Sequence, residues 1–209
     1  MKVLIINGSP RKKGNTSTAL QEMIKIFDQE NIETELIQVG QLPLSGCLGC
    51  GYCHKNGCCV KNDLVNEVNK KFEQADGLVI ASPVYYASPN GTLLAFLDRL
   101  FYSSRFDKTM KVGASVVCCR RGGASSSFDV LNKYFTISSM PVVSSIYWNS
   151  IHGGKINEAI YDEEGLSTMR VLARNMSFLI KAIAEYKKNN SLPIKEERVY
   201  TNFIRNINK

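Results

Sequence analysis

The residues between the first apolar run and the first helical pattern could bind a phosphate. Residues 3–6 are an apolar run typical of a buried strand, and residues 19–27 carry apolar side chains at helical spacing. The turn between them is rich in small and hydroxyl-bearing residues, and Arg11 adds a cation. Backbone N–H groups at a helix start point toward an anion there, and the helix dipole favours it. The turn therefore predicts a phosphate cradle, although an ordinary capped strand–turn–helix has a similar composition.

The glycine spacing excludes two common nucleotide-binding loops. Five residues separate Gly8 from Gly14, and Asn15 follows where a Walker loop requires Lys. A dinucleotide fingerprint requires Gly-x-Gly-x-x-Gly, whereas this turn holds only two glycines. The turn suits a single terminal phosphomonoester instead.

A cysteine-rich loop is the second chemical signal. The run Cys47-x2-Cys50-x2-Cys53-x4-Cys58-Cys59 is interspersed with glycines that allow tight turns. Four thiolates at this spacing could hold an iron–sulfur cluster or, less plausibly, zinc. Metal-free thiols and a disulfide are the alternatives, although the odd total of seven cysteines does not fit a secreted disulfide framework. The remaining two, Cys118 and Cys119, close an apolar run and are expected to be buried.

Composition and charge favour a single-domain cytoplasmic protein. A chain of 209 residues with 44% hydrophobic content can bury one sizeable core. No apolar run is long enough to cross a membrane, and the N-terminus has no secretion signal pattern. The net charge is +7, and residues 187–209 hold six basic against two acidic side chains. This tail lacks the interleaved aromatic residues of single-strand binders, so a solvated tail is favoured over nucleic-acid binding.

Strand and helix patterns alternate along the chain. The predicted strands cover residues 2–7, 34–39, 77–81, 111–118 and 141–146. The predicted helices cover residues 15–30, 64–75, 91–103, 128–135 and 163–187. Strands that are apolar on both faces indicate an α/β fold whose parallel sheet is covered by helices on both sides. Right-handed crossovers then predict a doubly wound five-stranded sheet in the flavodoxin-like order 2-1-3-4-5. We expect one domain over residues 1–190, with loop 40–62 as an insertion, and a basic tail over residues 191–209.

This strand order brings the loops after the first, third and fourth strands together at one crevice. The loop over residues 82–90 contains two prolines and two tyrosines, which suit a flat aromatic ligand or ordinary packing. The loop over residues 120–124 contains two glycines, which allow a backbone to approach a ring closely. Each loop alone is a weak signal, but three compatible loops at one crevice favour a mononucleotide site.

The chain resembles the NADPH-dependent FMN reductase group of the flavodoxin-like superfamily over nearly its whole length. The resemblance rests on the motifs Gly8-Ser9-Pro10-Arg11, Gly14-Asn15-Thr16, Ser82-Pro83-Val84-Tyr85-Tyr86, Leu97-Asp98-Arg99 and Arg121-Gly122-Gly123. It implies that the FMN phosphate is held by Ser9, Arg11, Asn15, Thr16 and Ser17. It implies that the flavin ring is lined by Pro83, Val84, Tyr85 and Tyr86, with Arg121, Gly122 and Gly123 at its other edge.

The cysteine run resembles the iron–sulfur flavoprotein branch of this group. Because the run from Cys59 to Asp63 matches that branch, the resemblance implies a 4Fe-4S cluster with Cys58 as a spare thiol. The implied cluster ligands are Cys47, Cys50, Cys53 and Cys59. It also places Trp148 near a flavin across a subunit interface, whereas a lone Trp in a loop more often packs in the core. Relatives are commonly dimers or tetramers, so a homodimer or homotetramer is expected.

The resemblance implies an oxidoreductase in which bound FMN carries the chemistry. Electrons would pass from NAD(P)H through FMN to a small acceptor, such as a quinone, an azo or nitro compound, or free flavin. No catalytic side chain is predicted, since the chain has two histidines and no Gly-x-Ser-x-Gly elbow. The alternative is an iron–sulfur flavoprotein or a non-catalytic electron carrier, although carriers of the flavodoxin type are usually acidic. A sensor that reads the cysteine loop is a third interpretation.

Overall fold

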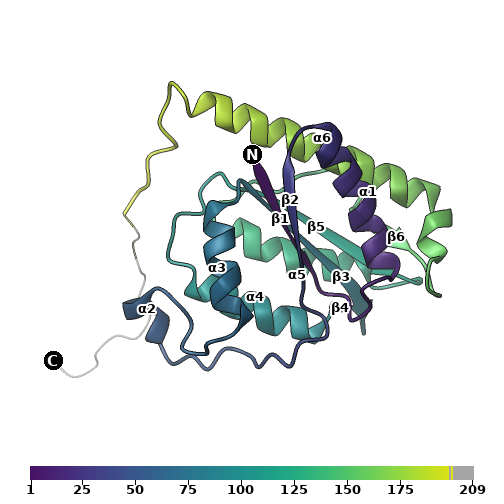
Figure 1. Ribbon diagram of the computed structural model, residues 1–209, viewed down its shortest axis with the longest axis horizontal. Helices are drawn as coiled ribbons and strands as arrows, with labels where there is room; N and C mark the ends of the chain where they lie inside the picture. The colour runs from purple at the N-terminus through teal and green to yellow at the C-terminus, as the bar shows by residue number, and fades with distance from the viewer. Residues whose placement is uncertain (198, 200–209) are drawn as a thin grey trace.

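The computed structural model describes residues 1–197 and 199 and is built around a parallel sheet (Figure 1). The five main strands are β1 (Lys2–Asn7), β2 (Glu33–Gln38), β3 (Gly77–Tyr85), β5 (Val112–Cys119) and β6 (Ser150–His152). They pair in the order β2-β1-β3-β5-β6, with every neighbouring pair parallel. The two-residue strand β4 (Ser88–Pro89) pairs antiparallel with the end of β3. The predicted flavodoxin-like order 2-1-3-4-5 is therefore confirmed once this short hairpin strand is set aside.

Helices cover both faces of the sheet (Figure 1). One face packs against α1 (Asn15–Gln29) and α6 (Glu163–Tyr186). The other face packs against α3 (Leu64–Gln74), α4 (Gly91–Ser103) and α5 (Ala124–Thr136). Two short elements complete the chain, namely α2 (Tyr52–Asn56) in the cysteine loop and the 3-10 turn η1 (Glu158–Tyr161).

The central strand β1 shows why the strands are apolar throughout. Val3 and Ile5 pack into the layer of α1 and α6, whereas Leu4 and Ile6 pack into the opposite layer. Successive side chains of a strand point to opposite faces, so a sheet covered on both sides requires apolar residues at every position.

The fifth strand lies later in the chain than predicted. Residues 141–146 form one bridge, in which Val142 pairs with Gly113, and the ladder with β5 resumes at Ser150. Between these points the chain leaves the sheet, and it returns where the Asn149 carbonyl accepts a hydrogen bond from Val117 N–H at 3.0 Å. The prediction of residues 141–146 was wrong because an edge strand needs a partner on one side only and can be interrupted. The apolar Val142-Val143 pair therefore indicated a core contact rather than a full strand.

Two other boundaries also differ from the sequence prediction. The strand β3 runs on to Tyr85 and turns back through β4, so part of the predicted loop 82–90 is a hairpin. The helix α5 begins at Ala124, before its apolar periodicity starts, because a run of serines occupies its first turn. Both differences stiffen loops at the carboxyl edge of the sheet.

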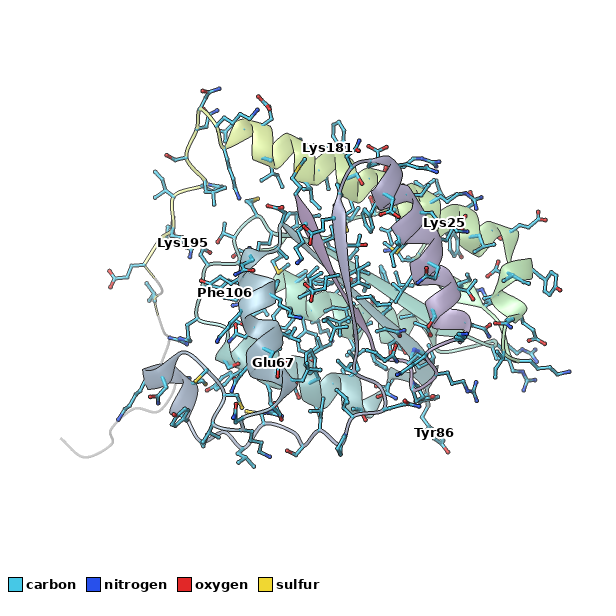
Figure 2. The ribbon with its side chains drawn as sticks, viewed as in Figure 1. Lys25, Glu67, Tyr86, Phe106, Lys181 and Lys195 are labelled. Carbon is cyan, nitrogen blue, oxygen red and sulfur yellow. The ribbon has the colours of Figure 1, made fainter. Side chains whose placement is uncertain are left out.

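The described part of the basic tail turns back along one side of the domain (Figure 1). Residues 187–197 leave α6, and Lys195, labelled in Figure 2, forms an ion pair with Asp107 at 2.8 Å. The tail cations Arg198, Arg205 and Lys209 lie outside the described residues. Among the residues that the structure describes, no helix combines the length and apolar character needed to cross a bilayer.

Candidate functional site

The turn after β1 leaves the start of α1 open to a ligand. The N-cap residue is Gly14, which has no side chain with which to cap the helix. The first backbone N–H groups of α1, from Asn15 to Ser17, therefore have no acceptor within the helix. An uncapped helix start of this kind favours an anion through both its N–H groups and its dipole.

Side chains of the turn hold its backbone in shape. Asn7 Oδ1 accepts a hydrogen bond from Ser9 N–H at 2.9 Å, and Asn7 Nδ2 donates to Ser17 Oγ at 3.1 Å. Ser17 Oγ donates to the Lys12 carbonyl at 2.8 Å, and Arg11 N–H donates to Ser9 Oγ at 3.2 Å. Asn7, Ser9 and Ser17 are buried. The cradle is thus fixed before any ligand enters, and Ser9 and Ser17 shape it.

Asn15 ties the cradle to a distant segment. Its Nδ2 donates to the Lys155 carbonyl at 2.8 Å, and its Oδ1 accepts from Ala159 N–H at 3.2 Å. A Cβ on Gly153 would lie 2.5 Å from the same Nδ2 atom, so the two segments are in close contact. Both amide atoms of Asn15 are therefore used within the protein, which leaves its backbone N–H as its donor for a ligand at the helix start. No motif or pattern indicated this contact, which joins residues 140 positions apart.

Exposed cations surround the cradle. They come from three segments and comprise Arg11, Lys12, Lys13, Arg120, Arg121 and Lys155. The segments meet where a Cβ on Gly154 would lie 3.2 Å from Arg120 Cγ. Glu158 Oε2 accepts hydrogen bonds from the backbone N–H groups of Lys155 and Gly154, both at 2.7 Å, and these bonds lower the pKa of Glu158. The carboxylate thus holds this segment in place, and as an anion it offsets one of the six positive charges of the rim.

The two loops predicted to flank a ring touch each other. Gly123 has a φ of +87°, and a Cβ there would lie 2.7 Å from Ala87 Cα and 3.0 Å from Val84 Cγ1. Ser126 Oγ donates to the Ala87 carbonyl at 2.7 Å. The hairpin is closed by the pairing of Val84 with Pro89. The loops after β3 and β5 therefore form one continuous wall, and Pro83 and Val84 are half-buried in it.

Several large aromatic side chains of the protein are exposed. Tyr86 is fully exposed, and Figure 2 shows it projecting from the hairpin away from the domain. Tyr85 is also exposed, as are Arg121 and Gly122 in the facing loop. Trp148 is 59% exposed and lies 5.2 Å from the Tyr147 ring, so the expectation of a buried packing role for this Trp was wrong.

The cysteine loop forms a pocket on the other side of α4. Its hollow is small, about 20 Å³ in volume, and the four cysteines that line it are Cys47, Cys50, Cys53 and Cys59. No carboxylate or imidazole of the described residues lines it, and Cys58 is outside the lining. Such an all-sulfur donor set suits a soft, thiolate-bound metal centre.

The four cysteines differ in how firmly they are held. Cys47 and Cys50 are exposed, whereas Cys53 is buried and burial raises the pKa of its thiol. Cys59 is half-buried, and its Sγ accepts hydrogen bonds from the Arg99 guanidinium. Among the described residues, no three Cys, His, Asp or Glu side chains converge closely enough to hold a metal as they stand. A metal site would therefore require loop 47–53 to close toward Cys59.

Two further cysteines end β5 beneath the cradle. Cys118 and Cys119 are buried, as predicted. Burial raises the pKa of Cys118 to about 12, with a further contribution from Cys119. A thiol with so high a pKa is a packing group rather than a nucleophile.

Comparison with known proteins gives a consistent result. Residues 1–155 match the NADPH-dependent FMN reductase family, a span that contains the cradle, the cysteine loop and both ring loops. An iron–sulfur flavoprotein of Methanocaldococcus jannaschii is 34% identical over 195 residues, which cover 88% of this chain and 99% of that protein. An iron–sulfur flavoprotein of Methanosarcina thermophila is 30% identical over 188 residues, which cover 88% of this chain and 97% of that protein.

Solved structures agree on the fold. FerB, a flavoenzyme NAD(P)H:(acceptor) oxidoreductase from Paracoccus denitrificans, superposes with a TM-score of 0.66 at 16% identity, covering 87% of this chain and 97% of its own. An archaeal flavodoxin superposes with a TM-score of 0.59 at 15% identity, covering 87% of this chain and 99% of its own. With the match over residues 1–155 and relatives at 30% identity or more, the chain belongs to the NADPH-dependent FMN reductase family.

Proposed function

We propose that this protein is an FMN-dependent oxidoreductase that takes electrons from NAD(P)H and delivers them to a small acceptor. The observation that carries the proposal is the convergence of an uncapped helix start and a two-loop wall at one edge of the sheet. Bound FMN supplies the redox chemistry, and the residues of the chain bind and orient it. The acceptor would be a quinone, an azo or nitro compound, or free flavin.

The phosphate end of FMN would bind at the start of α1. The backbone N–H groups of Asn15, Thr16 and Ser17 would donate to it, with the hydroxyls of Ser9 and Thr16 beside them. Arg11 would add a charge-assisted contact from the exposed rim. The side chains of Asn15 and Ser17 would act indirectly, by holding the shape of the loop, since both already form hydrogen bonds to protein atoms.

The ring end of FMN would rest against the wall formed by the loops after β3 and β5. Pro83, Val84 and Tyr85 offer apolar surface, and Tyr86 would turn inward to cover it. Gly122 and Gly123 would let backbone N–H groups approach one edge of the ring, and Arg121 would lie beside them. One face of the ring must stay open, since donor and acceptor would use it in turn.

The positive rim would attract the co-substrate. Pyridine nucleotides carry phosphate charges, and a rim of one sign raises their local concentration. NAD(P)H is also supported by the family description and by the name of FerB. One relative named an NADPH azoreductase, from a Bacillus species, is 26% identical over 167 residues and supports a small reducible acceptor.

Absorbance and turnover test the proposal together. Purified protein is expected to be yellow or to bind added FMN, and then to oxidise NADPH or NADH when a quinone is present. Binding of FMN without turnover of either nucleotide would favour a non-catalytic carrier instead. Failure to bind FMN at all would refute the proposal.

A second function is favoured by the cysteine pocket. We propose that Cys47, Cys50, Cys53 and Cys59 hold a 4Fe-4S cluster, so that the protein would be an iron–sulfur flavoprotein like the relatives that carry this name. The donor set fits, because four sulfurs line one hollow and no carboxylate or imidazole of the described residues lines it with them. Iron and acid-labile sulfide analysis on anaerobically purified protein tests this. Absence of iron in FMN-containing protein would leave a simple flavin reductase.

We also propose that the protein is a homodimer or homotetramer. Tyr86, Tyr147 and Trp148 expose large aromatic surfaces, and such surfaces are common at protein interfaces. Light scattering would give the mass in solution. A monomer at micromolar concentration would contradict this part of the proposal.

A further inference from the structure

Among the residues that the structure describes, the largest fully buried side chain is a cation at the cysteine pocket. Arg99 of α4 is 1% exposed. A buried guanidinium is costly unless its donors are satisfied and its charge is compensated. Asp63 compensates the charge and accepts two hydrogen bonds, since Nη1 donates to Oδ2 at 2.7 Å and Nη2 donates to Oδ1 at 2.9 Å. The geometry is a two-pronged pair, the strongest arrangement for these groups.

Two further donors of Arg99 are directed at one sulfur. Its Nε and Nη2 both lie 3.3 Å from Cys59 Sγ, and Nη1 lies 3.5 Å from the Ser45 carbonyl. A neutral thiol is a weak acceptor, whereas a metal-bound sulfur bears negative charge and accepts strongly. Two donors directed at one thiol therefore match a sulfur in its metal-bound form better than a free thiol.

The backbone of Cys59 is fixed from a second helix. Cys59 N–H donates to Asn66 Oδ1 at 2.8 Å, and Asn66 Nδ2 donates to the Cys59 carbonyl at 3.0 Å. Asn66 lies on α3, whose start is capped by Asp63 through Val65 N–H. The anchor of Cys59 is thus shared by α3 and α4. By contrast, Cys47 and Cys50 are exposed on a loop whose Gly49 and Gly51 have positive φ.

We propose that Arg99 is the positioning residue of the cysteine pocket. It holds Cys59 as the preformed ligand onto which the exposed loop closes, and it places a positive charge behind one ligand sulfur. The inference rests on the proposed four-cysteine site and adds a role that the sequence motif did not indicate. Two consequences follow: tighter metal binding, and a higher reduction potential for a bound cluster, because hydrogen bonds and charge at ligand sulfurs set that potential.

The test uses cobalt(II) added to reduced, metal-free protein under argon. Thiolate-to-cobalt charge-transfer absorbance reports binding, and its intensity per cobalt reports the number of thiolate ligands. The main variant is the double substitution Arg99→Gln with Asp63→Asn, which removes both charges of the pair and retains a residue able to cap α3. The control is Arg105→Gln, which removes an exposed cation near Cys53 without any hydrogen bond to a sulfur. Arg99→Lys keeps the charge and loses the two-pronged geometry.

The double variant is expected to bind cobalt about 10- to 100-fold more weakly than the wild type, the usual effect of removing an outer partner of a metal ligand. Its charge-transfer intensity per cobalt should fall, and Arg99→Lys should be intermediate. In protein reconstituted with iron and sulfide, the reduction potential of the cluster should be lower in the double variant than in the wild type. Arg105→Gln should match the wild type in all three measurements. Circular dichroism and FMN binding of each variant show whether the domain is folded.

Several results would overturn the inference. Equal cobalt affinity and equal intensity in the folded double variant would show that Arg99 has only a packing role. An equal loss in Arg105→Gln would show a general charge effect. If wild-type protein bound no cobalt through thiolates while still binding FMN, the four-cysteine site itself would be wrong, and the role of Arg99 with it.

Discussion

A Cβ on Gly123 would lie 2.7 Å from the Cα of Ala87, so the loops after β3 and β5 are in direct backbone contact. Gly123 also has a φ of +87°, and Ala87 has a φ of +56°. Two residues with left-handed backbone conformations are thus in contact, and they define the wall on which the flavin ring is proposed to rest. The position of Gly123 therefore couples backbone conformation to ligand binding.

Replacing Gly123 with Ala should weaken FMN binding by at least about tenfold. The added methyl has no room against Ala87, and an L-residue at this φ costs about 1–2 kcal/mol. Fluorescence titration of free FMN measures the affinity. The matched control is Gly46→Ala, where no atom lies within 4 Å of the added Cβ and the site is in the cysteine loop. Equal affinity in Gly123→Ala and wild type would contradict the proposed ring site.

Replacing Asn15 with Ala should destabilise the FMN-free protein and weaken FMN binding together. The change removes two hydrogen bonds that dock segment 153–159 on the cradle, worth about 1–2 kcal/mol in sum. For a chain of this size, the melting temperature should fall by about 2–8 °C. Differential scanning calorimetry measures it, with Asn62→Ala at an exposed loop position as the control. Loss of FMN affinity without loss of stability would mean that the Asn15 side chain contacts the ligand directly.

The order of the sheet could be predicted from the sequence because buried strands need apolar residues on both faces. The runs at β1, β3 and β5 are long and apolar, and their loops follow from that order. The short edge strand β6 carries one buried apolar residue, Ile151, and no periodic signal. Its place depends on pairing with β5, which is a tertiary contact.

The candidate site was predictable in position but less so in detail. The cradle and the four pocket cysteines were found because their residue types are local in sequence. The roles of Asn15 and Arg99 were missed because their partners are far away in the chain, 140 positions for Lys155 and 40 for Cys59. A motif indicates which residues are candidates for a functional role, whereas only the folded chain shows which atoms they contact.

A buried lysine just after α4 should make stability depend on pH. Lys108 is buried, with Nζ donating to the Ser104 carbonyl at 2.7 Å and lying 4.5 Å from the Phe106 ring. Burial, helped by the nearby Arg105 and Lys111 and opposed by Asp107, lowers the pKa of Lys108 from 10.5 to about 8. Between about pH 8 and 10.5 the unfolded chain binds more protons at Lys108 than the folded chain does. The free-energy cost of burying this charged side chain therefore falls as pH rises.

Lys108→Met removes this titration. The free energy of unfolding of the wild type, measured relative to that of Lys108→Met, should rise by on the order of 2 kcal/mol from about pH 7.5 to 10.5. Urea unfolding at several pH values measures the difference. Lys70→Met, at an exposed position of α3, should show no such change relative to the wild type. A difference between wild type and Lys108→Met that is constant with pH would contradict the low pKa.

The cysteines should differ strongly in their rates of reaction with iodoacetamide. In folded, metal-free protein, iodoacetamide should modify Cys47 and Cys50, which are exposed, at least about a hundredfold faster than Cys118. Burial raises the pKa of Cys118 to about 12, so at pH 8 only about one thiol in ten thousand is a thiolate. Peptide mass spectrometry measures each site, and unfolding in urea should make all of them react. Protein that holds a metal centre in the pocket should protect Cys47 and Cys50 as well, because a bound sulfur cannot attack. Fast modification of Cys118 in the folded chain would show that β5 opens at its end, beneath the cradle that is proposed to hold the FMN phosphate.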